Sequence, residues 1–433
     1  MQIIEYPDKK TWPDLLSRPV IDTTEIRKTV QNILDSVKLH GDEAVLHYTK
    51  RFDGEIKGSV QVNVDDIMES QNHLSEELKD AIHIASGNIK KFHQAQRRNV
   101  QKIETWPGVT CWRKSTPIEK VGLYIPGGTA PLFSTLLMLG IPAQIAGCSE
   151  IVLCTPAGEN GDIHPAMLYA AEVVGLKKIY KIGGAQAIAA MAYGTETIPK
   201  VHKIFGPGNQ YVTAAKQLVT LDGVAIDLPA GPSEVAVLAD DSANPDFIAL
   251  DLLSQAEHGP DSQVILVSDS DSLVNQVQKS INKYLSSLPR KNIAEQSLEK
   301  SKIFLVKDIK TGTALINTYA PEHLILNLRD SDKLAAKIKN AGSVFVGPYT
   351  PEAAGDYASG TNHTLPTKGY AMNYSGVSLE SFLKQITFQK INPEGLREIG
   401  WVIEEMADAE TLTAHKNAVS IRLAKLNEEV KNG

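Results

Sequence analysis

The chain has 433 residues, of which 42% are hydrophobic and 22% are charged. This length and composition allow a large apolar core and exclude a disulfide-stapled miniprotein, an intrinsically disordered chain and a coiled coil. The 44 basic and 51 acidic residues give a formal net charge of −7, which argues against nucleic acid as a partner.

The cysteines and the N-terminal residues favour a reducing, cytoplasmic compartment. Cys111, Cys148 and Cys154 show no CxxC spacing, and their odd number leaves one unpaired, so a reducing environment fits best. The first residues, MQIIEYPDKK, include an acid and no apolar segment, so we expect no signal peptide and a cytoplasmic location. The apolar run 130–147 contains two prolines and favours a buried helix over a membrane span.

The first quarter of the chain has a helical pattern. Apolar residues from Ile26 to Val37 recur at helical spacing after a cap at Asp22 and Thr23, and Gly41 is expected to end this helix.

From about Lys120, short β-branched runs alternate with helical patterns of roughly 10 to 15 residues, which is typical of parallel βαβ units. These strands are too many for one open sheet, so we predict two sheets, with the Pro/Gly-rich stretch 227–234 as the crossing between them. After Pro393 the chain is helical again, with a break around residues 408–413. The runs are VGLYIP, EIVLCTP, KIYKIGG, KIFGPGN, VAIDLP, EVAVLAD, QVILVSD, KIFLVKD, LILNL and SVFVG.

Three stretches carry side chains that could bind a metal. SQAEHGPDSQ places Gln255 and His258 at i and i+3 near a helix end, a spacing that puts two ligands on one helix face. GDYASGTNH offers Asp356 and His363 in a Gly-rich loop, and AETLTAHKNA offers Glu410 and His415 around a helix start. Taken singly, the three stretches are more typical of a capped helix end, a polar turn and a solvated helix terminus, respectively, than of a metal site.

Together these residues form a compatible set. Gln255, His258, Asp356 and His415 would supply two imidazoles, a carboxylate and an amide, which suits zinc or a similar borderline ion. Sequence spacing cannot show that they converge. Zinc has no redox chemistry of its own, so such a site would polarise or position another group.

The tetrapeptide PEHL contains a candidate acid/base pair, Glu322 and His323. Imidazole titrates near pH ~6.5, and a neighbouring carboxylate can orient it or activate a water. Adjacent residues on a strand point to opposite faces, so both could act on one substrate only from a turn. The alternative is a surface loop with two polar residues.

A nucleotide site is indicated only weakly. The GxGxxG fingerprint is absent, because GPGNQY has Tyr211 where the third glycine should stand. Glycine turns follow three strand-like runs, and ligands bind beyond the carboxyl ends of parallel strands. Tyr124, Gln186 and Asn209 lie there and could hydrogen-bond a cofactor.

The candidate site motifs occur along the chain in an order that matches a known protein family. SQAEHGPDSQ, PEHL, GDYASGTNH and LTAHKNA follow GLYIPGG, GGAQAIAA, FGPGN and DLPAGPSE, and with these eight motifs the chain closely resembles the histidinol dehydrogenase family. The resemblance runs from about Thr23 to the C-terminus, with no departure at the functional positions.

The resemblance implies an activity, cofactors and a set of site residues. The family oxidises L-histidinol through L-histidinaldehyde to L-histidine with two NAD, the last step of histidine biosynthesis. His323 would take the alcohol proton, and Glu322 would activate water for the aldehyde step. One zinc ion per subunit would be bound by Gln255, His258, Asp356 and His415. Substrate would contact Ser233, Gln255, His258, His323, Asp356, His363, Glu410 and His415, and NAD would contact Tyr124, Gln186 and Asn209.

The resemblance also implies the assembly and the domains. Family members are homodimers in which C-terminal residues complete the partner's site, so Glu410 and His415 would act in the other subunit. We predict an α/β fold of two incomplete Rossmann-like domains with parallel sheets, plus small N-terminal and C-terminal helical arms. The boundaries are an arm at 1–22, a main domain with the metal and catalytic residues at 23–123 and 233–377, an inserted NAD-binding domain at 124–232, and a helical dimerisation arm at 378–433.

Two other classes share the metal site. An α/β zinc hydrolase would use the same ligand types and a base to activate metal-bound water, but it would ignore NAD. A metal-stabilised binding protein would tolerate Glu322→Ala and His323→Ala without functional loss.

Overall fold

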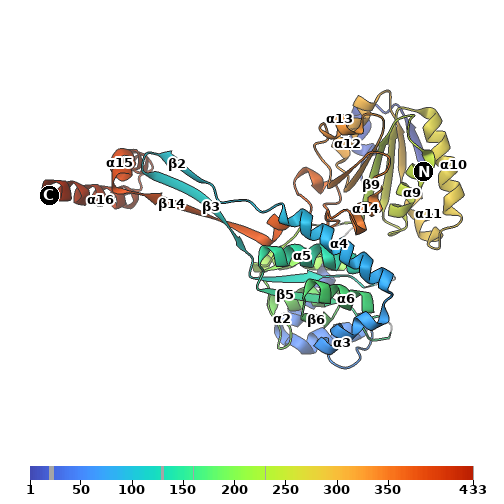
Figure 1. Cartoon of the computed structure of the whole chain (residues 1–433), viewed down its shortest axis with the longest axis horizontal. Coiled ribbons are helices and arrows are strands. Elements are labelled where there is room, and N and C mark those ends of the chain that lie inside the picture. The colour runs from blue at the N-terminus through green and yellow to red at the C-terminus, as the bar shows by residue number, and fades with distance from the viewer. Residues whose placement is uncertain (19–23, 128–130, 159, 230, 433) are drawn as a thin grey trace. The chain divides into compact units, whose positions relative to one another are not determined.

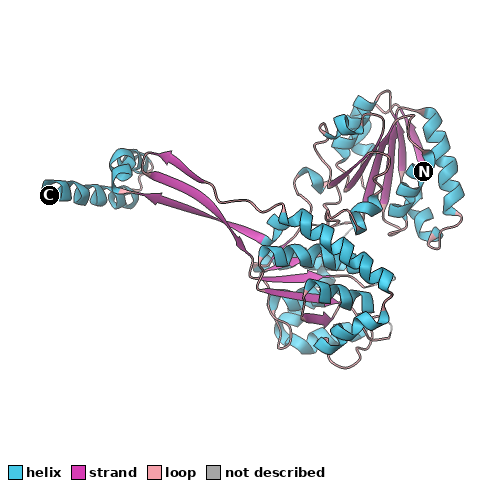
Figure 2. Ribbon diagram, in the orientation of Figure 1, coloured by secondary structure: helices cyan, strands magenta, loops and turns pink. Residues whose placement is uncertain are grey.

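The computed structural model describes residues 1–18, 24–127, 131–158, 160–229 and 231–432. The chain divides into two compact units: the first comprises Met1–Gln96 and Ile118–Phe382, and the second comprises Arg97–Pro117 and Leu383–Gly433. The first unit contains two parallel sheets flanked by helices, as Figures 1 and 2 show, which confirms the predicted α/β class.

One sheet of the first unit has six parallel strands. Residues of the strand β9 (Glu234–Ala239) alternate between the two faces of this sheet. Val235 and Val237 pack against the helices on one face, and Ala236 and Leu238 pack against the helices on the other. The strand order is β1 (Gln2–Glu5), β11 (Lys302–Leu305), β10 (Gln263–Ser268), β9 (Glu234–Ala239), β12 (His323–Asn327) and β13 (Ser343–Val346). One face is covered by α9 (Pro245–Ala256), α10 (Asp271–Leu285) and α11 (Lys291–Glu299), and the other by α1 (Trp12–Leu15), α12 (Ile309–Tyr319) and α13 (Ser331–Ala335).

The second sheet of this unit has five parallel strands. The order is β6 (Lys178–Lys181), β5 (Glu150–Thr155), β4 (Lys120–Tyr124), β7 (Lys203–Phe205) and β8 (Ala225–Ile226). Its core is shared with α2 (Thr24–Phe52), α7 (Gly184–Tyr193) and α8 (Gln210–Val219). The helices α3 (Val64–Glu69), α4 (Glu76–Gln94), α5 (Phe133–Ala146) and α6 (Pro165–Val174) pack with one another, and α5 also contacts β4. The remaining helix of this unit, α14 (Glu352–Tyr357), contacts α9.

The second unit combines an antiparallel sheet with two helices. Its strand order is β14 (Leu383–Ile391), β3 (Val109–Pro117) and β2 (Lys102–Trp106), and the helices are α15 (Pro393–Ala409) and α16 (Thr413–Asn432). The interval between α15 and α16 confirms the predicted break. The three strands β2, β3 and β14 were not predicted. Few of their residues are buried, so no buried β-branched run marks them in the sequence.

The predicted strands of the first unit are confirmed. Each of the ten runs contains a strand, and the stretch 227–234 joins β8 of one sheet to β9 of the other, although Ala230 lies outside the described residues. The helix α5 is buried along almost its whole length, as predicted. In the described part of the chain, no helix is long and apolar enough to span a membrane.

The first helical run ends at Gly41, as predicted: its φ of +52° and ψ of −131° are not helical, and a second helical segment follows this kink within α2 and extends to Phe52. One local prediction needs correction. The first quarter is not purely helical, because residues 2–5 form β1 and pair in parallel with β11. The predicted cap at Asp22 and Thr23 lies outside the described residues, and the predicted domain boundaries stay a prediction.

Candidate functional site

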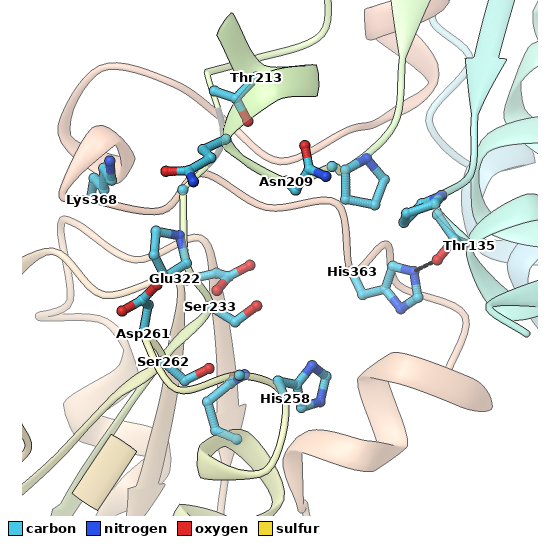
Figure 3. A pocket seen from close by; sticks show the side chains of 18 of the residues that line it. Thr135, Asn209, Thr213, Ser233, His258, Asp261, Ser262, Glu322, His363 and Lys368 are labelled. Carbon is cyan, nitrogen blue, oxygen red and sulfur yellow. Dashed lines mark hydrogen bonds between the residues drawn. The ribbon is translucent and has the colours of Figure 1, made fainter. Parts of the chain in front are cut away.

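A cavity of about 770 Å³ lies within the first unit. It is bordered by the amino ends of β9 and β12 and by the loop that follows β7. Figure 3 shows Ser233, His258 and Glu322 around this hollow, with His363 across from them. Eight residues predicted for substrate, metal, catalysis or cofactor line it: Asn209, Ser233, Gln255, His258, Glu322, His323, Asp356 and His363.

The predicted catalytic pair is buried at the start of β12. Glu322 lies in the turn before the strand and His323 is its first residue, so both side chains reach the cavity despite being adjacent in sequence. Each is bound by the backbone of Glu234 at the start of β9. The N–H of Glu234 donates to Glu322 Oε2 at 2.8 Å, and the carbonyl oxygen of Glu234 lies 3.1 Å from His323 Nδ1.

These contacts define the protonation of the pair. A carbonyl oxygen can only accept, so Nδ1 of His323 carries the hydrogen and Nε2 has the free lone pair. Burial lowers the pKa of His323 to about 4, which keeps the imidazole neutral at pH 7. Burial raises the pKa of Glu322 well above its usual value, although the N–H of Glu234 opposes this shift. The pair therefore consists of a neutral imidazole and a carboxyl group that readily holds a proton.

The predicted metal ligands of the first unit come from two helix ends. Gln255 is fully buried in the last turn of α9, whereas His258 lies beyond the end of that helix and is exposed. His258 therefore does not share a face of α9 with Gln255, contrary to the prediction. The turn after the helix brings His258 to the cavity, and the N–H of His258 donates to the carbonyl oxygen of Gln255 at 3.2 Å. Asp356 comes from α14, far along the chain.

Several buried polar atoms at the cavity lack partners. Gln255 Oε1 and Nε2, His323 Nε2 and Glu352 Oε2 have no hydrogen-bond partner among the described residues. Each unpaired group costs about 1–3 kcal/mol, unless a ligand satisfies it. Oxygen and imidazole-nitrogen donors of this kind are those that zinc accepts, so the residues fit a metal ion.

Glu352 was not among the site residues predicted from the sequence. Its side chain is buried at the cavity, and its closest ligand atom lies within 4.8 Å of those of His323 and Asp356. Burial raises the pKa of Glu352 well above its usual value, and the nearby charge of Asp356 adds to the shift. The i, i+4 spacing of Glu352 and Asp356 on α14 places both on one face and could have revealed the residue.

His363 is held between two partners. Its Nε2 lies 2.9 Å from Thr135 Oγ1, the contact drawn in Figure 3, and its Nδ1 lies 3.6 Å from Asp356 Oδ1. Burial would raise the pKa of Asp356, but the hydrogen bond to His363 and the neighbouring imidazoles outweigh it, and the pKa is lowered. Asp356 is therefore ionised at neutral pH and available to a cation.

The predicted cofactor residues lie at the carboxyl ends of the five-stranded sheet. Asn209 follows β7, lines the cavity and caps α8 by accepting from the N–H groups of Tyr211 and Val212. Tyr124 ends β4, and its hydroxyl accepts from the N–H of Gly184 at 3.1 Å. Gln186 is buried on α7, and neither it nor Tyr124 is among the described residues that line the cavity.

The remaining two predicted residues belong to the second unit. Glu410 follows the end of α15 and His415 lies in the first turn of α16, and both are exposed. The structure of one chain thus brings together Gln255, His258 and Asp356 but does not test the roles of Glu410 and His415.

Comparison with known proteins gives a consistent result. The profile described as histidinol dehydrogenase matches residues 16–423. The chain is 59% identical to a histidinol dehydrogenase of Bacteroides thetaiotaomicron over 98% of this chain and 100% of that protein. It is 50% identical to that of Escherichia coli strain K12 over 96% and 95% of the respective chains. A crystal structure of histidinol dehydrogenase from Elizabethkingia anophelis superimposes with a TM-score of 0.97 at 54% identity, covering 99% of both chains.

Proposed function

This chain belongs to the histidinol dehydrogenase family of oxidoreductases, and from that premise we propose that it oxidises L-histidinol through L-histidinaldehyde to L-histidine, the last step of histidine biosynthesis. The observation that carries this proposal is the buried Glu322–His323 pair beside unpartnered ligand atoms in one cavity. Alcohol oxidation needs a base for the hydroxyl proton, and aldehyde oxidation needs a water to be activated. The pair supplies one group for each requirement.

Four side chains are proposed to hold zinc: Gln255, His258, Asp356 and His415. When bound, zinc would position the substrate by binding the amine and imidazole groups of the substrate. NAD, which accepts the hydride in each of the two steps, would contact Tyr124, Gln186 and Asn209. Ser233, His363 and Glu410 would contact the substrate.

In the alcohol step, His323 acts as the base. Its Nδ1–H is committed to the Glu234 carbonyl, so Nε2 takes the hydroxyl proton. In the aldehyde step, Glu322 takes a proton from the attacking water and His323 accepts a further proton. A single closed site keeps the reactive aldehyde from escaping between the two steps.

The first test is turnover. L-histidinol and NAD are mixed with purified protein and the absorbance of reduced nicotinamide is followed, before and after chelation and after zinc is added back. We expect two NADH per histidine formed, with activity lost on chelation and restored by zinc. Absence of NADH from folded, zinc-loaded protein would overturn the proposal.

We also propose that the protein is a cytoplasmic homodimer in which Glu410 and His415 complete the partner's site. The helices α15 and α16 support an interface, because Trp401, Met406 and Ile421 are 62%, 63% and 69% exposed.

A heterodimer of two inactive variants tests this arrangement. One subunit carries His323→Ala and the other His415→Ala, with different affinity tags so that only the mixed dimer is purified. If the sites are shared, one of the two is intact and we expect about half of the wild-type activity per dimer. A heterodimer of His323→Ala and Asp356→Ala has no intact site and serves as the control. Activity no higher than that of this control would contradict sharing between subunits.

A further inference from the structure

Glu234 is the common partner of both catalytic groups. Its peptide N–H binds the carboxyl group of Glu322 and its carbonyl oxygen binds the imidazole of His323. β9 and β12 are neighbouring strands, and His323 pairs with Val235 in their register. The backbone position of one residue, Glu234, therefore fixes the distance between the two groups and the tautomer of the imidazole.

The side chain of Glu234 is itself firmly held. Arg18 Nε and Nη2 donate to its two carboxylate oxygens at 2.6 and 2.7 Å, and the N–H of Lys368 donates to Oε1 at 2.9 Å. The carboxylate side chain is 3% exposed and that of Arg18 is 18% exposed. A bidentate pair shielded in this way is among the stronger polar contacts in proteins.

Arg18 also holds the segment that leads into Glu322. Its Nη2 donates to the carbonyl oxygen of Tyr319 at 2.8 Å, and its guanidinium carbon lies 4.0 Å from the centre of the Tyr319 ring. The next residue, Ala320, has a φ of +52°, a left-handed conformation that a non-glycine residue adopts at a cost. The guanidinium group thus joins the start of β9 to the turn that carries Glu322.

We propose that Arg18 and Glu234 are positioning residues for the catalytic pair, an inference that rests on the proposed function. Neither side chain is among the described residues that line the cavity, so they act through the Glu234 peptide and the turn before Glu322. Only arginine combines a bidentate hydrogen bond to Glu234 with stacking on the ring of Tyr319. Lysine retains the positive charge but lacks the planar guanidinium group.

The test is a kinetic comparison of Arg18→Met, Arg18→Lys and Arg18→Ala. We expect Arg18→Met to lower kcat for L-histidinol by about 10- to 100-fold, since small displacements of catalytic groups have effects of this size. KM for L-histidinol and the zinc content should change by less than about threefold, because the residues proposed to bind the substrate and the zinc ion are unchanged. Arg18→Lys should have a kcat between that of Arg18→Met and that of the wild-type protein.

Chemical rescue separates positioning from a general structural role. Because Arg18 is partly exposed, Arg18→Ala leaves a gap that guanidinium ion can enter, and a low, non-denaturing concentration should raise kcat at least about fivefold. Arg329→Met is the matched control: Arg329 pairs with Asp241 just beyond the opposite end of β12, but both are well exposed. We expect wild-type kinetics from this control, with or without guanidinium.

The outcomes distinguish the inference from the proposed function. If wild-type protein does not oxidise L-histidinol, the proposed function fails first. If wild-type protein is active and Arg18→Met retains its kcat, only the positioning role is overturned. It is also overturned if all three variants lose kcat in step with their melting temperature and guanidinium restores nothing. Should Arg18→Met fail to fold, Arg18→Lys and the rescue of Arg18→Ala decide the question.

Discussion

Replacing Glu322 with glutamine is expected to reduce oxidation of L-histidinaldehyde by about 10²- to 10⁴-fold, while oxidation of L-histidinol falls by less than about tenfold. The amide keeps the size of the carboxyl group and an oxygen that accepts from the N–H of Glu234, so the turn should hold its shape. It cannot take a proton from water, however. In the proposed mechanism the alcohol step depends on Nε2 of His323, which the substitution leaves in place.

The two steps are measured separately by rapid mixing with NAD, starting once from L-histidinol and once from L-histidinaldehyde. We expect the variant to form close to one NADH per L-histidinol and to release or retain the aldehyde. Glu295→Gln is the matched control, because Glu295 lies in an exposed ion pair with Lys291. Equal losses in the two steps would contradict the proposed division between Glu322 and His323.

Replacing Gln255 with leucine is expected to weaken zinc binding by at least about 100-fold and to stabilise the metal-free protein. Both polar atoms of this fully buried side chain lack hydrogen-bond partners among the described residues. Leucine has a similar volume and no polar atoms, so the free energy of unfolding without metal should rise by about 1–3 kcal/mol. The gain in stability and the loss of metal affinity then have one cause.

Urea denaturation in the presence of a chelator measures the stability, and competition with a chromophoric chelator measures the affinity for zinc. Gln263→Leu is the control, since Gln263 is also buried but accepts a hydrogen bond from the Tyr319 hydroxyl at 2.8 Å. This control should be destabilised, because it leaves that hydroxyl unpaired. A Gln255→Leu protein that is less stable without metal, or that binds zinc normally, would refute the assignment of Gln255 as a ligand.

Most strands of the two parallel sheets could be predicted because they are buried on both faces, whereas β1, which is largely unburied, was missed. Runs such as EVAVLAD and QVILVSD contain four or five consecutive apolar residues between polar ends, and this local signal suffices to identify a strand. The strands β2, β3 and β14 lack this signal, because few of their residues are buried. Pairing with one another in an antiparallel sheet is what holds them in place.

The candidate residues could be predicted, but their arrangement could not. Motif order identified Gln255, His258, Glu322, His323 and Asp356, and the structure gathers them at one cavity. The general rule for parallel sheets points to the carboxyl ends of strands, where Asn209 lies. Glu322 and His323 lie instead at the amino end of β12.

The sequence by itself determined the fold class, the crossing between the sheets and the set of candidate site residues, because these depend on local patterns and on motif order. The tertiary structure alone decided which groups meet. Arg18 and Glu234 are 216 residues apart and carry no mutual signal in the chain, yet strand pairing and burial bring them into a bidentate contact. The same packing leaves Gln255 and Glu352 with buried atoms that have no partner in the described part of the chain, a property that depends on every neighbour and on no single motif.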